Sequence, residues 1–226
     1  MKKVIPILFV FAFQQAFTQD IDRFYENSKC GYKDKATGTV IVKPYYDAGS
    51  EFTNGIALIV KNGKRGYIDK KGEIIIPLIY DDASIFYYGL ARITINKKNG
   101  YINKNGTVAI SLKYDFADDF YDGLALVSMN KKFGFIDTTG KIIIPLIYEN
   151  AHNFSEELAP VKLDKWGYID KTGKVIIPLE YENAWVFNNK MAAVWKKNKG
   201  FFIDKKGNFI KDIENRKEKE KEFERK

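Results

Sequence analysis

The chain has 226 residues, of which 45% are hydrophobic, and it carries 37 lysines and arginines against 29 aspartates and glutamates. Aromatic residues make up 15% and there are only 6 prolines, a composition that excludes both a disordered polymer and a proline-rich chain. One Cys and one His exclude an internal disulfide framework and the usual structural zinc sites, which need about four such ligands. We expect no cofactor.

The amino terminus has the pattern of a secretory signal peptide. Lys2 and Lys3 precede an apolar run over residues 4–13, and small residues follow at Ala16 and Thr18. The run has about half of the roughly twenty apolar residues that a transmembrane helix needs. The sequence therefore predicts a cleaved segment over residues 1–18, no stable membrane span, and export to the periplasm, the cell surface or the medium.

The charge that remains after cleavage is modest. Removing Lys2 and Lys3 leaves 35 basic residues against 29 acidic ones, a net charge of +6. Nucleic-acid-binding proteins usually concentrate basic residues on one face and add groups that read or stack on bases, and no such pattern is visible here. We expect no nucleic-acid partner.

An internal repeat dominates the rest of the chain. The segment Gly66-Tyr67-Ile68-Asp69 recurs at Gly100, Gly134 and Gly167, at intervals of 34, 34 and 33 residues. Altered copies begin at Gly31 and Gly200. A fixed period of this length is the signature of a tandem array, whose end units are commonly irregular.

Each repeat has the same order of blocks, shown here for the second unit. A strand over 66–69 leads into a tight turn that ends at Gly72, and an apolar segment over 74–77 predicts a buried strand, in which the proline marks either the end of the strand or an unpaired edge. A connector over 80–86 then carries Tyr, Ala and Phe, which we interpret as packing residues between units. A third strand over 90–93 completes the unit.

The blocks are clearest over residues 165–178, Lys-Trp-Gly-Tyr-Ile-Asp-Lys-Thr-Gly-Lys-Val-Ile-Ile-Pro. This segment resembles the WG repeat family, a group of bacterial tandem β-repeats, and the resemblance covers roughly residues 30–210. Only Trp166 precedes the repeated glycine as in the family pattern. The resemblance implies a repeat fold, but it implies no single activity and supplies no catalytic residues.

The predicted fold is all-β, with three antiparallel strands in each repeat of about 33–34 residues and the units arranged as an open or curved stack. The repeat domain should cover residues 19–210, with units starting near 31, 66, 100, 134, 167 and 200, and a charged tail should follow over residues 211–226. The alternative is a closed, propeller-like ring of six units, in which residues 21–25 would pair with the last hairpin.

Two groups of side chains are candidate partner-binding residues. Stacked hairpin tips would align lysines into a basic ridge, and aromatic residues vary from repeat to repeat near the connectors, where binding specificity could reside. The ridge candidates are Lys97, Lys98, Lys131, Lys132, Lys196 and Lys197, and the aromatic candidates are Trp185 and Tyr121, with Tyr87 and Tyr88 nearby.

The leading hypothesis is an exported, non-catalytic scaffold that binds a protein or a glycan at the cell envelope. One alternative is a carbohydrate-active enzyme that uses a pair of connector carboxylates, since two carboxylates suffice for glycoside hydrolysis. The connector acids are Asp47, Asp81, Asp115, Glu149 and Glu182. Another alternative is a purely structural or assembly component. The oligomeric state stays open.

Overall fold

The computed structural model describes residues 20–213, which form 23 strands in six sheets and no helix. The first sheet contains β1 (Ile21–Glu26), β2 (Lys29–Asp34) and β3 (Val40–Tyr46); the second contains β4 (Ala48–Gly49), β5 (Ile56–Lys61), β6 (Lys64–Asp69) and β7 (Ile74–Tyr80). The third contains β8 (Asp82–Ala83), β9 (Leu90–Ile95), β10 (Lys98–Asn103) and β11 (Val108–Tyr114); the fourth contains β12 (Phe116–Ala117), β13 (Leu124–Met129), β14 (Lys132–Asp137) and β15 (Ile142–Tyr148). The fifth contains β16 (Asn150–Ala151), β17 (Ala159–Lys162), β18 (Trp166–Ile169) and β19 (Val175–Tyr181); the sixth contains β20 (Asn183–Ala184), β21 (Ala192–Lys196), β22 (Lys199–Ile203) and β23 (Phe209–Asp212).

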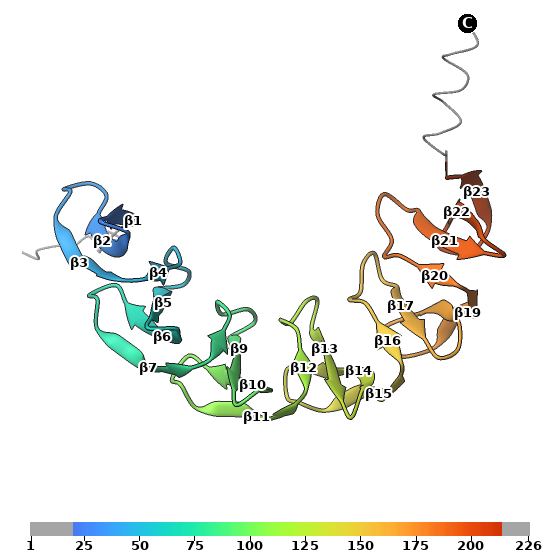
Figure 1. Cartoon of the computed structure of the whole chain (residues 1–226), viewed down its shortest axis with the longest axis horizontal. Coiled ribbons are helices and arrows are strands. Elements are labelled where there is room, and N and C mark those ends of the chain that lie inside the picture. Colours follow the sequence, from blue (N-terminus) through green and yellow to red (C-terminus); the bar gives the residue numbers. More distant parts are fainter. Residues whose placement is uncertain (1–19, 214–226) are drawn as a thin grey trace, which may run out of the picture.

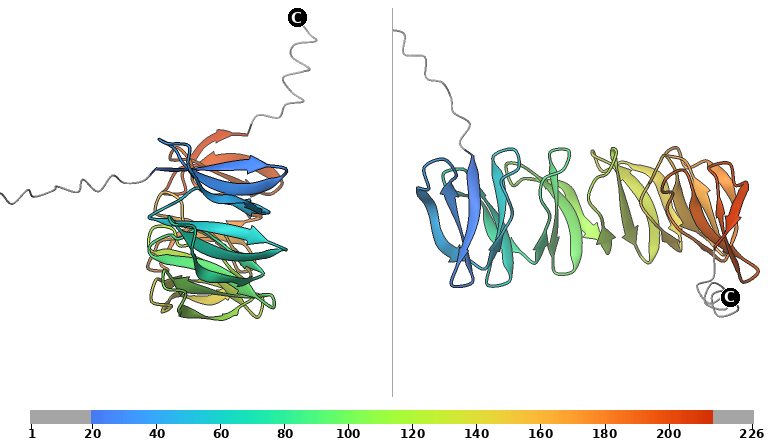
Figure 2. Two further views of the ribbon diagram at one scale, coloured as in Figure 1. Left: turned by 90° about the vertical axis from the view of Figure 1, so that its left-hand side faces the viewer. Right: turned by 90° about the horizontal axis from the view of Figure 1, so that it is seen from above.

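The six sheets stand one behind another along an open arc (Figure 1). The ends of the arc lie far apart, and the view from above shows the sheets in chain order from the first to the last (Figure 2). Strand β1 pairs with β2 and not with the last hairpin. The predicted all-β, open and curved stack is therefore confirmed, and the alternative of a closed ring is wrong.

Five of the six sheets contain the three expected antiparallel strands and one more, and the first sheet contains three strands. The connector contributes a two-residue strand, such as β8, which pairs with β9 on the inner side of the sheet. Two residues are too few to show an alternating pattern in the sequence, which explains why only three strands were expected. A sheet also combines parts of two successive sequence units, because the third strand of one unit pairs with the first strand of the next.

The glycine that begins each of the first five repeats is required by a bulge in the neighbouring strand. At Gly134, an added Cβ would lie 2.5 Å from the carbonyl oxygen of Ile144, and the register between β14 and β15 shifts at this point. Any larger residue would collide with backbone that cannot rotate away. The same close approach occurs at Gly31, Gly66, Gly100 and Gly167.

Adjacent sheets interlock through the aromatic residues of the repeat. The ring of Tyr67 in one sheet lies 4.9 Å from that of Phe86 in the next, and its hydroxyl donates a hydrogen bond of 2.6 Å to the carbonyl oxygen of Ser84. Both rings are buried. The connector phenylalanine thus packs between adjacent sheets, but its partner is the tyrosine of the first strand of the same sequence repeat and not a residue of the next repeat. The equivalent ring pairs are Tyr32 with Phe52, Tyr101 with Phe120, Phe135 with Phe154, and Tyr168 with Phe187.

The apolar segment over 74–77 was expected to form a buried strand; the strand is present as β7, but its expected burial on both faces is wrong. Strand β7 is the outer strand of its sheet, and Ile74 is 54% exposed whereas Ile76 is 1% exposed. Pro77 is also exposed. Because of a bulge, Ile76 pairs with Tyr67 and Ile74 with Ile68, which are neighbours in β6 and face opposite sides of the sheet, and of the two isoleucines only Ile76 is buried. Proline has no backbone N–H to donate. At the unpaired edge of a sheet no neighbouring strand needs that hydrogen bond, so the prolines are tolerated there.

The predicted signal peptide lies outside the described residues, as does the charged tail from residue 214 onward. Strand β23 continues to Asp212 and so includes the first residues assigned to that tail.

Candidate functional site

Two-residue turns project from the inner side of the arc, between the two innermost strands of each sheet. In the third sheet, Tyr87 and Leu90 exchange backbone hydrogen bonds of 2.8 and 2.9 Å, and Tyr88 and Gly89 form the turn. The corresponding turns of the other repeats contain residues 54–55, 122–123, 156–157 and 189–190. Both turn residues have positive φ, the geometry whose twist suits a tight hairpin.

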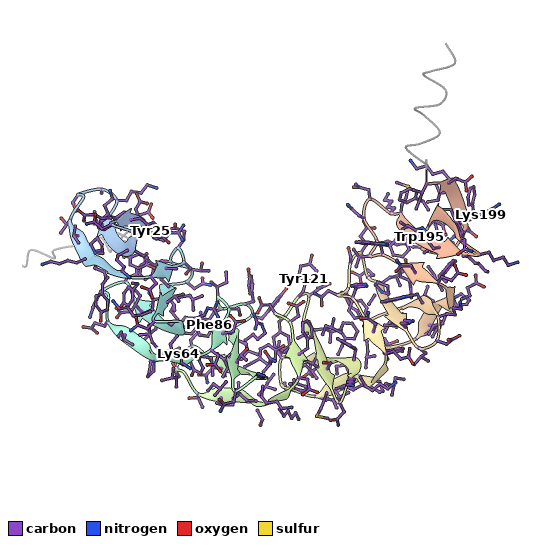
Figure 3. All side chains as sticks on the ribbon, in the orientation of Figure 1. Tyr25, Lys64, Phe86, Tyr121, Trp195 and Lys199 are labelled. Carbon is purple, nitrogen blue, oxygen red and sulfur yellow. The ribbon has the colours of Figure 1, made fainter. Side chains whose placement is uncertain are left out.

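A groove of about 590 Å³ lies among the β8–β9, β12–β13 and β16–β17 loops, which belong to three successive sheets. Its volume is in the range of small-molecule sites. The residues that matter for its chemistry are Tyr87, Tyr88, Asp118, Asp119, Tyr121 and Asn153. Figure 3 shows Tyr121 at a loop tip on the inner side of the arc, whereas Phe86 lies inside the stack.

The tyrosines of the groove are not explained by core packing. Tyr121 is 65% exposed, Tyr88 is 63% exposed and Tyr87 is 44% exposed. Tyr87 and Tyr121 occupy the same position in successive repeats, where the other repeats carry Thr53, Ser155 and Asn188. The groove is therefore the place where aromatic residues replace small polar ones.

Tyr88 also has an unfavourable backbone conformation. Its φ is +51°, in the left-handed region that bulky residues rarely adopt. The equivalent residues of the other repeats are Asn54, Asp122, Glu156 and Asn189, and Asn and Asp tolerate this region well. Neither packing nor backbone preference explains a tyrosine here, and residues held in such conformations cluster at functional sites.

Two neighbouring carboxylates line the groove in different surroundings. Asp118 accepts a hydrogen bond of 2.7 Å from the side-chain amide of Asn153. Asp119 is partly buried, and burial raises the pKa of its carboxyl group, although a hydrogen bond from Ser84 and the charge of Arg92 act in the opposite direction. The Arg92 Nε atom lies 3.8 Å from a carboxylate oxygen of Asp119 and its Nη1 atom lies 2.8 Å from Asp82.

The candidate lysines lie away from this groove, at the hairpin tips. Lys97 and Lys131 have positive φ within their two-residue turns, and so does Lys197. Lys98 is ion-paired at 2.5 Å with Asp115, and Lys196 at 2.7 Å with Glu180. Among the described residues, Lys132 has no ion-pair partner, like the three turn lysines. Part of the basic ridge is therefore neutralised within the fold, and its role in binding stays a prediction.

The connector acids hold neighbouring hairpin tips together. Asp81 accepts a hydrogen bond of 2.6 Å from Lys64 at one tip and another of 2.8 Å from the backbone N–H of Asn96 at the next. Asp115 makes the same two contacts with Lys98 and Asn130, and the hydrogen bond from Lys98 is the main reason why its pKa is lowered. The sequence favours a capping or turn role for these acids, but it does not reveal their partners, which lie 15 to 17 residues away.

Trp185 is exposed by 59% and occupies the repeat position of Asp118. Each of these residues follows a two-residue strand, and its backbone carbonyl oxygen accepts a hydrogen bond from a tyrosine hydroxyl. Trp185 accepts from Tyr168 at 2.7 Å, and Asp118 accepts from Tyr101 at 2.5 Å. Of the aromatic residues singled out from the sequence, Tyr121, Tyr87 and Tyr88 line the groove, whereas Trp185 and the candidate lysines do not. The sequence analysis did not select Asp118, Asp119 or Asn153. Other repeats carry different residues at the matching positions, and this difference could have identified them as candidates.

Residues 20–213 contain no helix suited to crossing a membrane, and no group of three or more His, Cys, Asp or Glu side chains within that range could hold a metal ion.

The family follows from the repeat itself. The WG containing repeat matches residues 31–64, 66–98, 100–133, 133–165 and 166–199 in tandem. The chain belongs to the WG repeat family. In this WG repeat the bulge requires the glycine, and the Tyr and Phe pack adjacent sheets together, so these residues recur. The tryptophan precedes the glycine only at Trp166.

No curated protein matches the sequence. A solved eukaryotic initiation factor is similar in structure, with 8% identity and a TM-score of 0.51; the likeness covers 86% of this chain and 63% of that one. Hsv2 from Kluyveromyces lactis has 9% identity and a TM-score of 0.45, covering 83% and 71%. A structure from B. thetaiotaomicron described as the extracellular domain of a one-component system has 13% identity and a TM-score of 0.44, covering 84% and 32%. At such identities, the likeness to the initiation factor concerns the fold alone.

Proposed function

We propose that this WG repeat protein is an exported, non-catalytic scaffold that binds a glycan in the groove on its inner side. The observation that carries the proposal is the set of exposed tyrosines beside carboxylate and amide groups. Aromatic faces pack against the apolar faces of sugar rings, while carboxylates and amides accept or donate hydrogen bonds to the hydroxyl groups. Export is supported by the basic and apolar pattern of residues 1–18.

The connector acids favour binding over glycoside hydrolysis by a connector pair. A general acid that works near neutral pH needs a raised pKa, and hydrogen bonds lower the pKa of Asp47, Asp81, Asp115 and Glu182. Their carboxylates are also occupied by lysines or by backbone N–H groups of the hairpin tips.

The test is capture from cell-envelope extract by the immobilised mature chain, with the glycan and protein fractions analysed separately. A double variant, Tyr88→Asn with Tyr121→Ser, introduces residues that other repeats carry at these positions. We expect wild type to retain a glycan fraction that the double variant loses.

Retention of the same glycan by both proteins would reject the groove as the binding site. If charge reversal at Lys97 and Lys131 abolished capture while the tyrosine variant bound normally, the basic ridge would replace the groove.

A further inference from the structure

We infer that the ligand of the groove is an extended, uncharged polysaccharide whose rings stack on tyrosines of successive repeats. The inference rests on the proposed function and adds the shape and charge class of the glycan. It follows from three properties of the groove: its direction along the arc, the signs of the charges that line it, and the conformation of Tyr88.

The groove runs along the stack and not within one repeat. Its lining residues come from the β8–β9, β12–β13 and β16–β17 loops, each from a different sheet. Sheets that pack face to face lie about 10 Å apart, so loops of three successive sheets span roughly 20 Å. That length suits several linked rings in an extended chain better than a single sugar.

The tyrosines repeat in the same direction. Tyr87 and Tyr121 occupy equivalent positions in neighbouring repeats, so the same side chain is offered again one sheet further along the arc. A chain of similar sugar rings would meet them in succession. A compact or branched ligand would not use this repetition.

The lining is acidic and contains no basic side chain. Asp118 and Asp119 face the groove, and the nearest arginine, Arg92, is already engaged by Asp82 and Asp119. A uronic acid, sialic acid or phosphorylated glycan would bring like charge against these carboxylates and would find no cation in the lining to pair with. Hydroxyl groups of an uncharged sugar can donate hydrogen bonds to the same oxygens.

Tyr88 gives independent support. It is exposed at a left-handed position where the other repeats carry Asn, Asp or Glu, so the chain retains backbone strain in order to present an aromatic ring. Replacement by asparagine should relieve the strain. Binding and stability should therefore change in opposite directions at this residue.

The experiment measures affinity of the full mature chain by calorimetry against two panels of oligosaccharides of increasing length. One panel is uncharged and includes both α- and β-linked chains; the other contains oligogalacturonides. We expect binding only to the uncharged panel, with an affinity that rises with length until the chain spans the groove. Equal or tighter binding of oligogalacturonides would overturn the inference while leaving the proposed function intact. Binding to neither panel would overturn both.

Tyr88→Asn is the decisive variant, and Tyr45→Asn is its control. Tyr45 is exposed to a similar extent but lies on the outer strand β3. We expect Tyr88→Asn to weaken binding about tenfold, the effect of losing one stacked ring, and to unfold at an equal or higher denaturant concentration. The control should bind as wild type. Unchanged affinity in Tyr88→Asn, or an affinity that does not depend on chain length, would reject the stacking arrangement.

Discussion

At one position of the repeat, a tyrosine hydroxyl links each sheet to the next. The hydroxyls of Tyr32, Tyr67, Tyr101 and Tyr168 each donate to a carbonyl oxygen of the following sheet's loop, at distances between 2.5 and 2.9 Å. The fourth sheet carries Phe135 instead, with its ring still 4.8 Å from that of Phe154. Packing is thus preserved at this junction without the hydrogen bond.

This difference predicts opposite effects for two substitutions. Tyr67→Phe should lower the free energy of unfolding by about 1 kcal/mol, because a buried hydrogen bond is lost without a change in ring packing. Phe135→Tyr should raise it by up to about 1 kcal/mol if its hydroxyl reaches the loop as the four tyrosines do. Urea unfolding measures both. Equal stability of Tyr67→Phe and wild type would show that the hydrogen bond contributes nothing net.

Two aspartates should also give stability opposite pH dependences. Asp115 has a lowered pKa in the folded chain, so the stability it contributes is present above its ordinary value of 3.8 and is lost as the pH falls through the lower folded value. Asp119 has a raised pKa, so its contribution is present below 3.8 and is lost as the pH rises through the higher folded value.

At neutral pH, Asp115→Asn should therefore be less stable than wild type and Asp119→Asn more stable. The Asp119→Asn difference should shrink as the pH falls through the raised folded pKa of Asp119 towards 3.8, whereas the Asp115→Asn difference should persist to 3.8 and shrink only as the pH falls further, through the lowered folded pKa of Asp115. Urea midpoints measured from pH 7 downward test this. A difference that keeps its size at low pH would point to packing and not to charge.

At the scale of the element, the repeated glycine is set by the shape of its sheet. Gly134 accommodates the bulge between β14 and β15, and Gly123 instead has a φ of +84° in a turn with no atom within 4 Å of an added Cβ. The two glycines thus serve different purposes, close approach in one case and backbone conformation in the other.

Gly134→Ala should be the more damaging of the two alanine substitutions. We expect it to lower the free energy of unfolding by at least about 2 kcal/mol, because the methyl group forces backbone apart. Gly123→Ala should cost about 1 kcal/mol, the penalty for a left-handed alanine. Thermal or urea unfolding of both proteins decides this. If Gly123→Ala were the more destabilising, the bulge would not explain the recurrence of the first glycine.

The sequence predicted the elements unevenly, for identifiable reasons. The turn at Asp69 was predictable because its carboxylate accepts hydrogen bonds of 2.9 Å from the backbone of Lys71 and Glu73, all within five residues. The exposure of Ile74 was not, because periodicity cannot tell an outer strand from a buried one when both faces are apolar. The groove escaped prediction because its carboxylates and tyrosines come from three loops that only the stacking brings together.

At the scale of the whole molecule, each sheet packs only against its neighbours along the arc. Sheets at the two ends have one neighbour each, so a defect at one junction should not spread to the far end. Phe187 is fully buried at the last junction, against Tyr168, and Phe52 contacts Tyr32 at the first.

Phe187→Ala should cost about 3 to 5 kcal/mol locally and accelerate amide hydrogen exchange in β20 to β23, with no change in β1 to β3. Phe52→Ala should produce the reverse pattern and serves as the matched control. Hydrogen exchange followed by mass spectrometry resolves the two ends. Equal acceleration in all six sheets for either variant would mean that the arc unfolds as one cooperative unit.

The open arc has a further consequence for how such a chain can change over evolutionary time. A closed ring fixes the number of its units, since one more or one fewer would spoil the fit between the last and the first. Here the sheets are built on the same glycine bulge and the junctions use similar aromatic pairs, four of Tyr with Phe and one of Phe with Phe, and the two ends never meet. Duplication of a segment of 33 or 34 residues would therefore lengthen the arc while leaving every existing contact in place. The length of the inner surface of the arc would then change by duplication of repeats and not by point mutation.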